Sequence, residues 1–179
     1  KKNGYTDIVF LDDNEDVHEC GGYSVIGKSS EAGRLNADLI IGIGNAEIRK
    51  RIQESVSKER LATLIHPAAV VAEDVVLGAG TVVMAGAVIN SGARIGSGCI
   101  INTCSSVDHD CILGDYVHIA VGSHLCGTVI VGSQTWIGAG AIVSNNMSVC
   151  SNCMIGAGAV IVKNIEESGI YIGVPARSI

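Results

Sequence analysis

Aliphatic side chains recur at every sixth position of the chain between residues 65 and 161, without one interruption. The seventeen positions, all Ile, Leu or Val, are Ile65, Val71, Leu77, Val83, Ile89, Ile95, Ile101, Val107, Leu113, Ile119, Leu125, Val131, Ile137, Val143, Val149, Ile155 and Ile161. A period of six matches neither the 3.6-residue period of an amphipathic helix nor the 3.5-residue period of a coiled coil. It is typical of a parallel β-helix, a solenoid in which each hexad forms one short strand and one corner.

Two further positions of the hexad support this prediction. Four residues after the aliphatic site the side chain is usually small or β-branched, as at Ala87 and Cys99. Glycine often follows the aliphatic residue directly, and these glycines are Gly78, Gly96, Gly114, Gly132, Gly138 and Gly156. A glycine allows close approaches that a Cβ would hinder. Three hexads make one triangular coil of 18 residues, so residues 18 apart are predicted to stack about 4.8 Å from each other.

The first sixty residues follow a different pattern. Residues 8–11 predict a buried parallel strand that ends in Asp12 and Asp13, and residues 38–43 predict a second one. Gly44 and Asn45 then precede a helix predicted over 46–56. This order indicates a small α/β unit over residues 1–62, with ligands at the strand ends and the helix N-terminus. Polar turns and ordinary helix caps explain the same residues equally well.

Composition narrows the classes of protein. Hydrophobic residues make up 47% of the 179 residues but aromatic residues only 3%, which suits the narrow interior of a solenoid over residues 63–179. Apolar runs are too short for a membrane span. The net charge of −6, without a basic cluster, argues against nucleic acid as a partner.

The seven cysteines do not suggest a disulfide framework. Cys99, Cys111 and Cys153 fall on the small inward position of the hexad, where a free thiol acts as a small hydrophobic group. No secretory leader is visible at the start of the sequence. Reduced thiols and a cytoplasmic location are therefore expected.

The candidate chemistry lies in Asp108-His109-Asp110. A carboxylate that binds one ring nitrogen of a histidine fixes the tautomer, so that the other nitrogen can act as a general base. Both aspartates are candidates for this role, and an exposed polar corner without function is the common alternative. Gly127 follows His109 by 18 residues, so it is predicted to stack on His109, leave room for a substrate and offer a backbone N–H to an oxyanion.

A second column of small residues and the remaining histidines complete the candidates. Ala139 and Ala157 are 18 residues apart and predict a smooth groove suited to a thread such as pantetheine. His118 and His124 occupy the same hexad position one hexad apart, so they are expected to point to different faces. A three-histidine zinc site with His109 would need a neighbouring subunit, and no metal is expected.

Taken together, these residues resemble the hexapeptide-repeat acyltransferases, whose solenoid is a left-handed β-helix. More narrowly, the chain is similar to the bacillosamine-type UDP-4-amino-sugar N-acetyltransferases and to the related sialic acid O-acetyltransferases. The motifs that carry the resemblance are Phe10-Leu11-Asp12-Asp13, Ile43-Gly44-Asn45, Glu47-Ile48-Arg49, Asn102-Thr103, His109-Asp110, Gly114-Asp115, His118, Gly127 and Gly173-Val174-Pro175-Ala176-Arg177.

The resemblance implies an acetyl-CoA-dependent homotrimer with active sites between neighbouring solenoids and a nucleotide sugar as the acceptor. It implies that His109 deprotonates the acceptor and that Asp110 orients His109. It further implies the following contacts: Gly127 with the thioester carbonyl, His118 with the acetyl group, Ala139 and Ala157 with pantetheine, Asn102 with the acceptor sugar, and Asp12, Asp13, Gly44 and Asn45 with the nucleotide.

Two departures from the family pattern affect these expectations. Members usually carry a strand and a glycine-histidine loop ahead of Phe10, so the Rossmann-like α/β unit is expected to be incomplete on its N-terminal side. The partner of His109 is often a glutamate in the N-acetyltransferases. Because Asp110 is shorter, Asp108 becomes a stronger candidate for the residue that orients His109. O-acetylation of sialic acid, a scaffold without catalysis and a zinc enzyme remain the rival functions.

Overall fold

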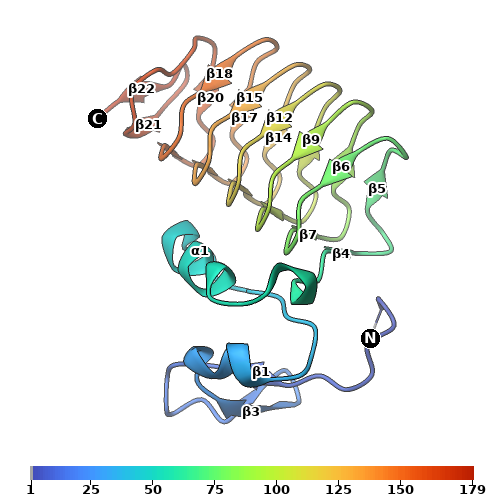
Figure 1. The fold of residues 1–179 in the computed structure, drawn as a ribbon. Helices are drawn as coiled ribbons and strands as arrows, with labels where there is room; N and C mark the ends of the chain where they lie inside the picture. Colours follow the sequence, from blue (N-terminus) through green and yellow to red (C-terminus); the bar gives the residue numbers. More distant parts are fainter. Residues whose placement is uncertain (1) are drawn as a thin grey trace.

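The computed structural model describes residues 2–179 and shows a left-handed parallel β-helix preceded by a small α/β unit, as predicted (Figure 1). The solenoid has three faces, which we call face 1, face 2 and face 3. Face 1 holds β4 (Leu64–Ile65), β7 (Val82–Val83), β10 (Ile100–Ile101), β13 (His118–Ile119), β16 (Trp136–Ile137), β19 (Met154–Ile155), β21 (Ile170–Ile172) and β22 (Arg177–Ser178). The first strand of the solenoid thus begins at Leu64, and the division of the chain at residue 62 remains a prediction.

The other two faces consist only of parallel two-residue strands. Face 2 holds β5 (Val70–Val71), β8 (Val88–Ile89), β11 (Ser106–Val107), β14 (His124–Leu125), β17 (Ile142–Val143) and β20 (Val160–Ile161). Face 3 holds β6 (Val76–Leu77), β9 (Arg94–Ile95), β12 (Ile112–Leu113), β15 (Ile130–Val131) and β18 (Ser148–Val149). We name the corners between successive faces corner 1–2, corner 2–3 and corner 3–1.

The predicted 18-residue register is confirmed. Ile101 pairs with Ile119, and Val107 pairs with Leu125. From Val83 to Ile161 every aliphatic position of the hexad is buried. The first coil is less protected, because a coil stacks on only one side of it: Ile65 is exposed, and Val71 and Leu77 are partly buried.

Glycine at the start of a corner allows the coils to approach each other. At corner 3–1 this position is Gly78, Gly96, Gly114 and Gly132 in four successive coils. A Cβ built on Gly132 would lie 2.7 Å from the carbonyl carbon of Cys150 in the next coil. A contact this short cannot form without moving backbone, so the glycine is required by stacking.

The N-terminal unit departs from the sequence prediction in its strands. β1 (Phe10–Leu11) pairs in parallel with β3 (Tyr23–Gly27), and β2 (Glu19–Cys20) pairs antiparallel with β3. The strand predicted over 8–11 is shorter than expected and not buried, because Val9 and Phe10 are exposed on this small sheet. Short 3₁₀ helices follow at Ser29–Arg34 and Lys58–Arg60.

The second predicted strand, over 38–43, is wrong, and the predicted helix is confirmed. Only Leu39 forms a bridge, to Leu61. The carbonyls of Ile43 and Gly44 instead accept hydrogen bonds from the Arg49 side chain, so these acceptors are satisfied without a neighbouring strand. The helix is α1 (Ala46–Glu54), which ends two residues before the predicted end at residue 56. No helix within residues 2–179 is long and apolar enough to cross a membrane.

Arg49 joins α1 to the solenoid. Its side chain is fully buried, with Nε donating to the Gly98 carbonyl at 2.7 Å and Nη2 donating to the Tyr116 carbonyl at 2.7 Å. Gly98 and Tyr116 stack on each other at corner 3–1, and Gln53 donates to Ala79 at the same corner. Burial lowers the pKa of Arg49, but a guanidinium stays charged. Helix α1 therefore covers corner 3–1 at the three coils that contain Ala79, Gly98 and Tyr116.

Replacement of Gly132 by alanine tests the stacking requirement. We expect Gly132→Ala to lower the free energy of unfolding by about 1–3 kcal/mol, because the added methyl group overlaps the next coil. Denaturant unfolding of the variant and the wild type measures this difference. The control is Gly42→Ala in the N-terminal unit, the same substitution at a glycine where a Cβ meets nothing within 4 Å. Equal stability of Gly132→Ala and the control would refute the requirement.

Candidate active site

The Asp108-His109-Asp110 segment forms corner 2–3 between β11 and β12. His109 Nδ1 lies 2.9 Å from Asp110 Oδ2, and the two side chains are 55% and 64% exposed, so the pair is open to a substrate. Asp110 has φ of 58°, and its carboxylate lies over Gly92 of the preceding coil, where a Cβ would overlap it. The corner therefore holds an accessible histidine with a carboxylate on one ring nitrogen.

Asp108 does not share this role. Its Oδ1 accepts one hydrogen bond from Asn90 Nδ2 at 2.7 Å and another from the backbone N–H of His109 at 2.8 Å. The bond from Asn90 is the main reason why the pKa of Asp108 lies below its usual value. Sequence alone left both aspartates open, whereas the structure places the His109 ring on Asp110.

The environment sets the protonation of His109. Nδ1–H donates to Asp110, which leaves the Nε2 lone pair free. The hydrogen bond to Asp110 raises the pKa of His109, and the charges of Asp108 and Asp110 act in the same direction. The opposite ring edge faces Gly127, where an added Cβ would overlap Nε2. His109 is thus a base whose free nitrogen lies against the next coil.

Gly127 stacks on His109 as predicted and offers a free donor. Its carbonyl accepts from Asn146 at 3.1 Å, and Thr128 N–H donates to the His109 carbonyl at 2.9 Å. Among the hydrogen bonds of residues 2–179, none uses the Gly127 N–H. A backbone N–H next to the base nitrogen is the kind of donor that stabilises an oxyanion.

His118 and Asn102 form a second polar group, beside corner 1–2. Asn102 Oδ1 accepts from the Thr103 N–H at 2.8 Å, so its Nδ2 is the atom that donates to His118 Nε2 at 3.1 Å. The tautomer follows from this orientation: Nε2 accepts, and the proton of the neutral ring is on Nδ1. The ring stacks on Trp136, with centroids 5.2 Å apart and planes at 15°.

His118 is a neutral donor, in contrast to His109. Burial, followed by the positive charge of Arg49, lowers the pKa of His118 to about 4. The Nδ1 atom is buried and has no hydrogen-bond partner in the described part of the chain. A buried N–H without a partner costs free energy, so this atom is suited to receive an acceptor from a ligand.

Ala139 and Ala157 form the predicted column of small residues at corner 1–2. The Ala139 carbonyl accepts from the Gly158 N–H at 2.8 Å, which fixes the stacking of the two coils. Gly140 and Gly158 follow them, and a Cβ on either glycine would meet nothing within 4 Å. Asn102 lies at the same corner two coils earlier.

The predicted site is therefore divided between two corners of one chain. Corner 2–3 holds His109, Asp110 and Gly127, whereas the corner 1–2 side holds Asn102, His118, Ala139 and Ala157. The two corners border face 2 on its opposite edges. A single chain does not bring the two groups together.

The residues predicted to bind the nucleotide have local roles in the N-terminal unit. Asp12 Oδ1 accepts from the Asn14 N–H at 2.8 Å. Asp13 accepts from both the N–H and the hydroxyl of Ser29, and the hydroxyl bond is the main cause of its lowered pKa. Asn45 caps α1 by accepting from the Ile48 N–H at 2.9 Å, and Gly44 accepts from Arg49. Nucleotide binding by Asp12, Asp13, Gly44 and Asn45 stays a prediction.

Sequence reasoning missed two residues that shape the site. Trp136 stacks on His118, and the signal was available, because Trp136 follows His118 by 18 residues. Arg49 lowers the pKa of His118 from α1, and no period connects the helix to the solenoid. His118 and His124 lie on faces 1 and 2, as expected. In residues 2–179 no three His, Cys, Asp or Glu side chains form a group suited to a metal.

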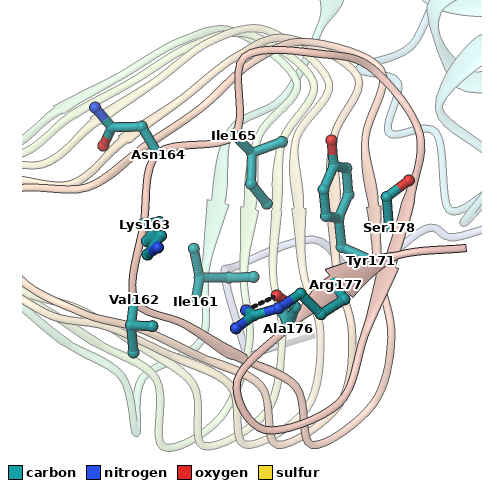
Figure 2. A pocket seen from close by; sticks show the side chains of 9 residues that line it. All are labelled: Ile161, Val162, Lys163, Asn164, Ile165, Tyr171, Ala176, Arg177 and Ser178. Atoms are coloured by element: carbon teal, nitrogen blue, oxygen red, sulfur yellow. Dashed lines mark hydrogen bonds between the residues drawn. The ribbon is translucent and has the colours of Figure 1, made fainter.

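Two cavities in the described part of the chain lie away from these residues. One cavity, of about 320 Å³, lies between the last coil and the C-terminal segment and includes Ile165 and Tyr171 (Figure 2). Another, of about 420 Å³, lies against α1. Neither contains His109 or His118.

Known proteins resemble this chain over its whole length. Residues 1–56 match the family model described as PglD N-terminal domain. The acetyltransferase domain of PglB from Neisseria gonorrhoeae FA1090, solved in complex with acetyl coenzyme A, is 38% identical, with a TM-score of 0.94 over 99% of this chain and 88% of that one.

Two relatives of named activity also match. The GDP-perosamine N-acetyltransferase of Escherichia coli O157:H7 is 29% identical over 69% of this chain. The UDP-N-acetylbacillosamine N-acetyltransferase of Bacillus subtilis (strain 168) is 40% identical over 30% of this chain. The matched stretches span 58% and 26% of the lengths of these two relatives.

Proposed function

The chain belongs to the hexapeptide-repeat family of sugar acyltransferases, and from this membership we propose that it acetylates an amino sugar carried on a nucleotide. Acetyl-CoA is the donor, and a UDP-linked 4-amino sugar is the acceptor. The relatives named above include enzymes for a GDP-linked and a UDP-linked amino sugar, and the UDP enzyme is the more identical of the two over its matched stretch. The observation that carries the proposal is the exposed His109–Asp110 pair against the free N–H of Gly127.

In the proposed reaction the amine attacks the thioester carbon directly. A C–N bond forms and the C–S bond breaks, while His109 Nε2 takes a proton from the attacking nitrogen and passes one to the leaving thiolate. Asp110 acts as a positioning residue, because its hydrogen bond keeps the proton on Nδ1 and stabilises the imidazolium. The step forms no covalent intermediate with the protein, so none of the seven cysteines is required.

Two donors support an oxyanion in this proposal. The Gly127 N–H lies beside the base nitrogen, and His118 Nδ1–H is buried without a partner in the described residues. Because His118 has a pKa of about 4, it remains a neutral donor at pH 7 and does not compete with His109 for the proton. These donors lie on different corners, so both can meet one thioester only if two chains contribute.

We therefore place the site between chains of a homotrimer. Each chain offers corner 2–3 to one neighbour and corner 1–2 to the other, which is a head-to-tail contact that closes into a ring. Corner 3–1 is unavailable for such a contact, since Arg49 and Gln53 hold α1 against it. With corner 1–2 of each chain in contact with corner 2–3 of the next, face 2 of every chain points toward the axis. Three such three-sided solenoids complete the ring.

The outward side chains of face 2 support this arrangement. They are Val70, Val88, Ser106, His124, Ile142 and Val160. Four of the six are aliphatic, and Val70 is 65% exposed in the single chain. The two polar members, Ser106 and His124, bind each other at 2.8 Å. A column of this kind is suited to burial between copies of the chain.

Transfer assays test the proposed reaction. We expect the wild type to release CoA from acetyl-CoA with a UDP-4-amino sugar, and His109→Ala to lower turnover by roughly 10²–10⁴. The control is His18→Ala, at an exposed histidine of the N-terminal unit that lies outside both corners, and it should leave turnover unchanged. Parallel reactions with a GDP-linked amino sugar and with free and nucleotide-linked sialic acid assign the acceptor. An acetyl-CoA concentration 100 times the Kd should raise the free energy of unfolding by about 2.7 kcal/mol. If a large excess of acetyl-CoA left this free energy unchanged, a scaffold would be the better description.

The pH profile tests the role of Asp110. Only neutral His109 accepts a proton, so its raised pKa places the acid limb of kcat/KM above the ordinary value for histidine of about 6.5. Asp110→Asn removes the carboxylate, lowers the pKa of His109 and should move the acid limb to lower pH. We expect the plateau to fall by roughly 10–10² as well. An unchanged limb would assign the orienting role elsewhere.

Charge on face 2 tests the assembly. We expect Ile142→Asp to yield monomers in light scattering and to abolish transfer, because three carboxylates would meet near the axis. Ile130→Asp is the matched control on face 3, where Ile130 is 49% exposed and Ile142 on face 2 is 38% exposed. The control should remain trimeric. Loss of the trimer in the control but not in Ile142→Asp would place a different face at the axis.

A further inference from the structure

Two thiols meet at the last coil of the solenoid, away from the proposed active site. Cys150 and Cys153 belong to the Cys-Ser-Asn-Cys turn at corner 3–1, and their Sγ atoms are 3.4 Å apart. Both cysteines are free thiols. They are the first and fourth residues of one tight turn, as in Cys-x-x-Cys motifs.

The stacking of the coils explains why corner 3–1 can hold this pair in its last coil. In the four preceding coils the first position of corner 3–1 is glycine, because a Cβ there overlaps the next coil. After Cys150 no complete coil follows, and its N–H instead donates to the carbonyl of Ile165 in the C-terminal segment at 2.9 Å. Only the terminal coil can therefore hold a side chain at this position, beside the inward Cys153.

A single hydroxyl group holds both ends of the turn. Thr135, in the coil below, donates from Oγ1 to the Cys150 carbonyl at 2.9 Å and accepts from the Cys153 N–H at 3.2 Å. A four-residue turn keeps its end Cα atoms within about 7 Å, and disulfides span about 4.4–6.8 Å between Cα atoms. The two sulfur atoms need to approach by about 1.4 Å to reach the bonded distance.

The two thiols differ in exposure. Cys153 is 3% exposed, and burial raises its pKa to about 11. Cys150 is partly buried and packs against the hydrophobic core. The cavity shown in Figure 2 includes Ile165, the residue that Cys150 contacts through its backbone. The more exposed Cys150 is therefore the thiol that meets a solute first.

We propose that Cys150 and Cys153 form a redox modification site that a hydroperoxide converts into an intrachain disulfide. In the first step Cys150 Sγ attacks the peroxide, which is reduced to water or an alcohol, and Cys150 becomes a sulfenic acid. In the second step Cys153 Sγ attacks the sulfenic sulfur, the S–S bond forms and a water molecule leaves. The net reaction converts two thiols and one hydroperoxide into one disulfide, one water and the reduced peroxide, which is a second water or an alcohol.

The site is separate from the proposed catalysis. His109 lies at corner 2–3 and His118 beside corner 1–2, whereas the thiols lie at corner 3–1. The turn contacts the C-terminal segment at two points. The Cys150 N–H donates to the Ile165 carbonyl, and Cys153 Sγ lies 3.7 Å from the Glu167 carbonyl. A disulfide would thus fix the turn on which this segment rests, while the transferase groups stay in place.

Peptide mapping tests the proposal with the folded, full chain. The protein is treated with hydrogen peroxide, alkylated with N-ethylmaleimide and digested. We expect a peptide with Cys150 joined to Cys153, lighter by two hydrogen atoms, and its loss after dithiothreitol. The exposed Cys20 of the N-terminal unit is the internal control for general thiol oxidation. Oxidation of Cys20 without a Cys150–Cys153 bond would overturn the proposal, as would a bond that forms only in denaturant.

Two variants separate the steps. Cys153→Ser should trap the sulfenic acid on Cys150, which dimedone labels, with roughly tenfold more label than on Cys150 of the wild type. Cys150→Ser should leave Cys153 unlabelled, because this thiol is buried. Equal labelling of the wild type and Cys153→Ser would show that Cys153 does not resolve the sulfenic acid, and would exclude the site.

Discussion

The 18-residue stacking register is the constraint on which the rest of the structure depends. Each coil from Val83 to Ile161 buries its aliphatic positions against its neighbouring coils, so the register cannot slip by one residue without exposing the interior. The same register decides which side chains meet outside the core. It places Gly127 on His109, Trp136 on His118 and Asn90 on Asp108. The candidate chemistry is therefore a consequence of how the interior packs.

The buried guanidinium of Arg49 adds the second constraint, which bears on the proposed trimer. Its donors go to carbonyl groups of both the N-terminal unit and the solenoid, and within residues 2–179 none goes to a carboxylate. A fully buried cation is tolerated when carbonyl dipoles satisfy it, and loss of these partners would be costly. Because this contact occupies corner 3–1, the proposed trimer would use the other two corners. The contact that docks the N-terminal unit would thus also favour face 2 at the axis of that trimer.

The sequence predicted the solenoid far better than the unit ahead of it, for a physical reason. A hexad repeats one environment seventeen times, so pattern, face and stacking partner all follow from Ile65 to Ile161. The N-terminal unit has no such repetition. There, the carbonyls of Ile43 and Gly44 bind the Arg49 side chain rather than a neighbouring strand. No local sequence pattern predicts these two hydrogen bonds. The choice between Asp108 and Asp110 could have been made from the sequence. Asn90 precedes Asp108 by 18 residues, so it stacks on Asp108 and binds its carboxylate.

The two histidines of the candidate site show how environment separates chemically identical groups. His109 is exposed and binds a carboxylate, so its pKa is raised and its free nitrogen is a base. His118 is buried near a guanidinium and accepts from Asn102, so its pKa falls to about 4 and its free nitrogen is a donor. Groups of one kind whose pKa values are pushed apart are typical of paired roles in catalysis. In the proposed trimer the base of one chain would meet the donor of the next. Both groups would then act on the same thioester: one removes a proton from the nucleophile, and the other binds the oxygen that gains charge.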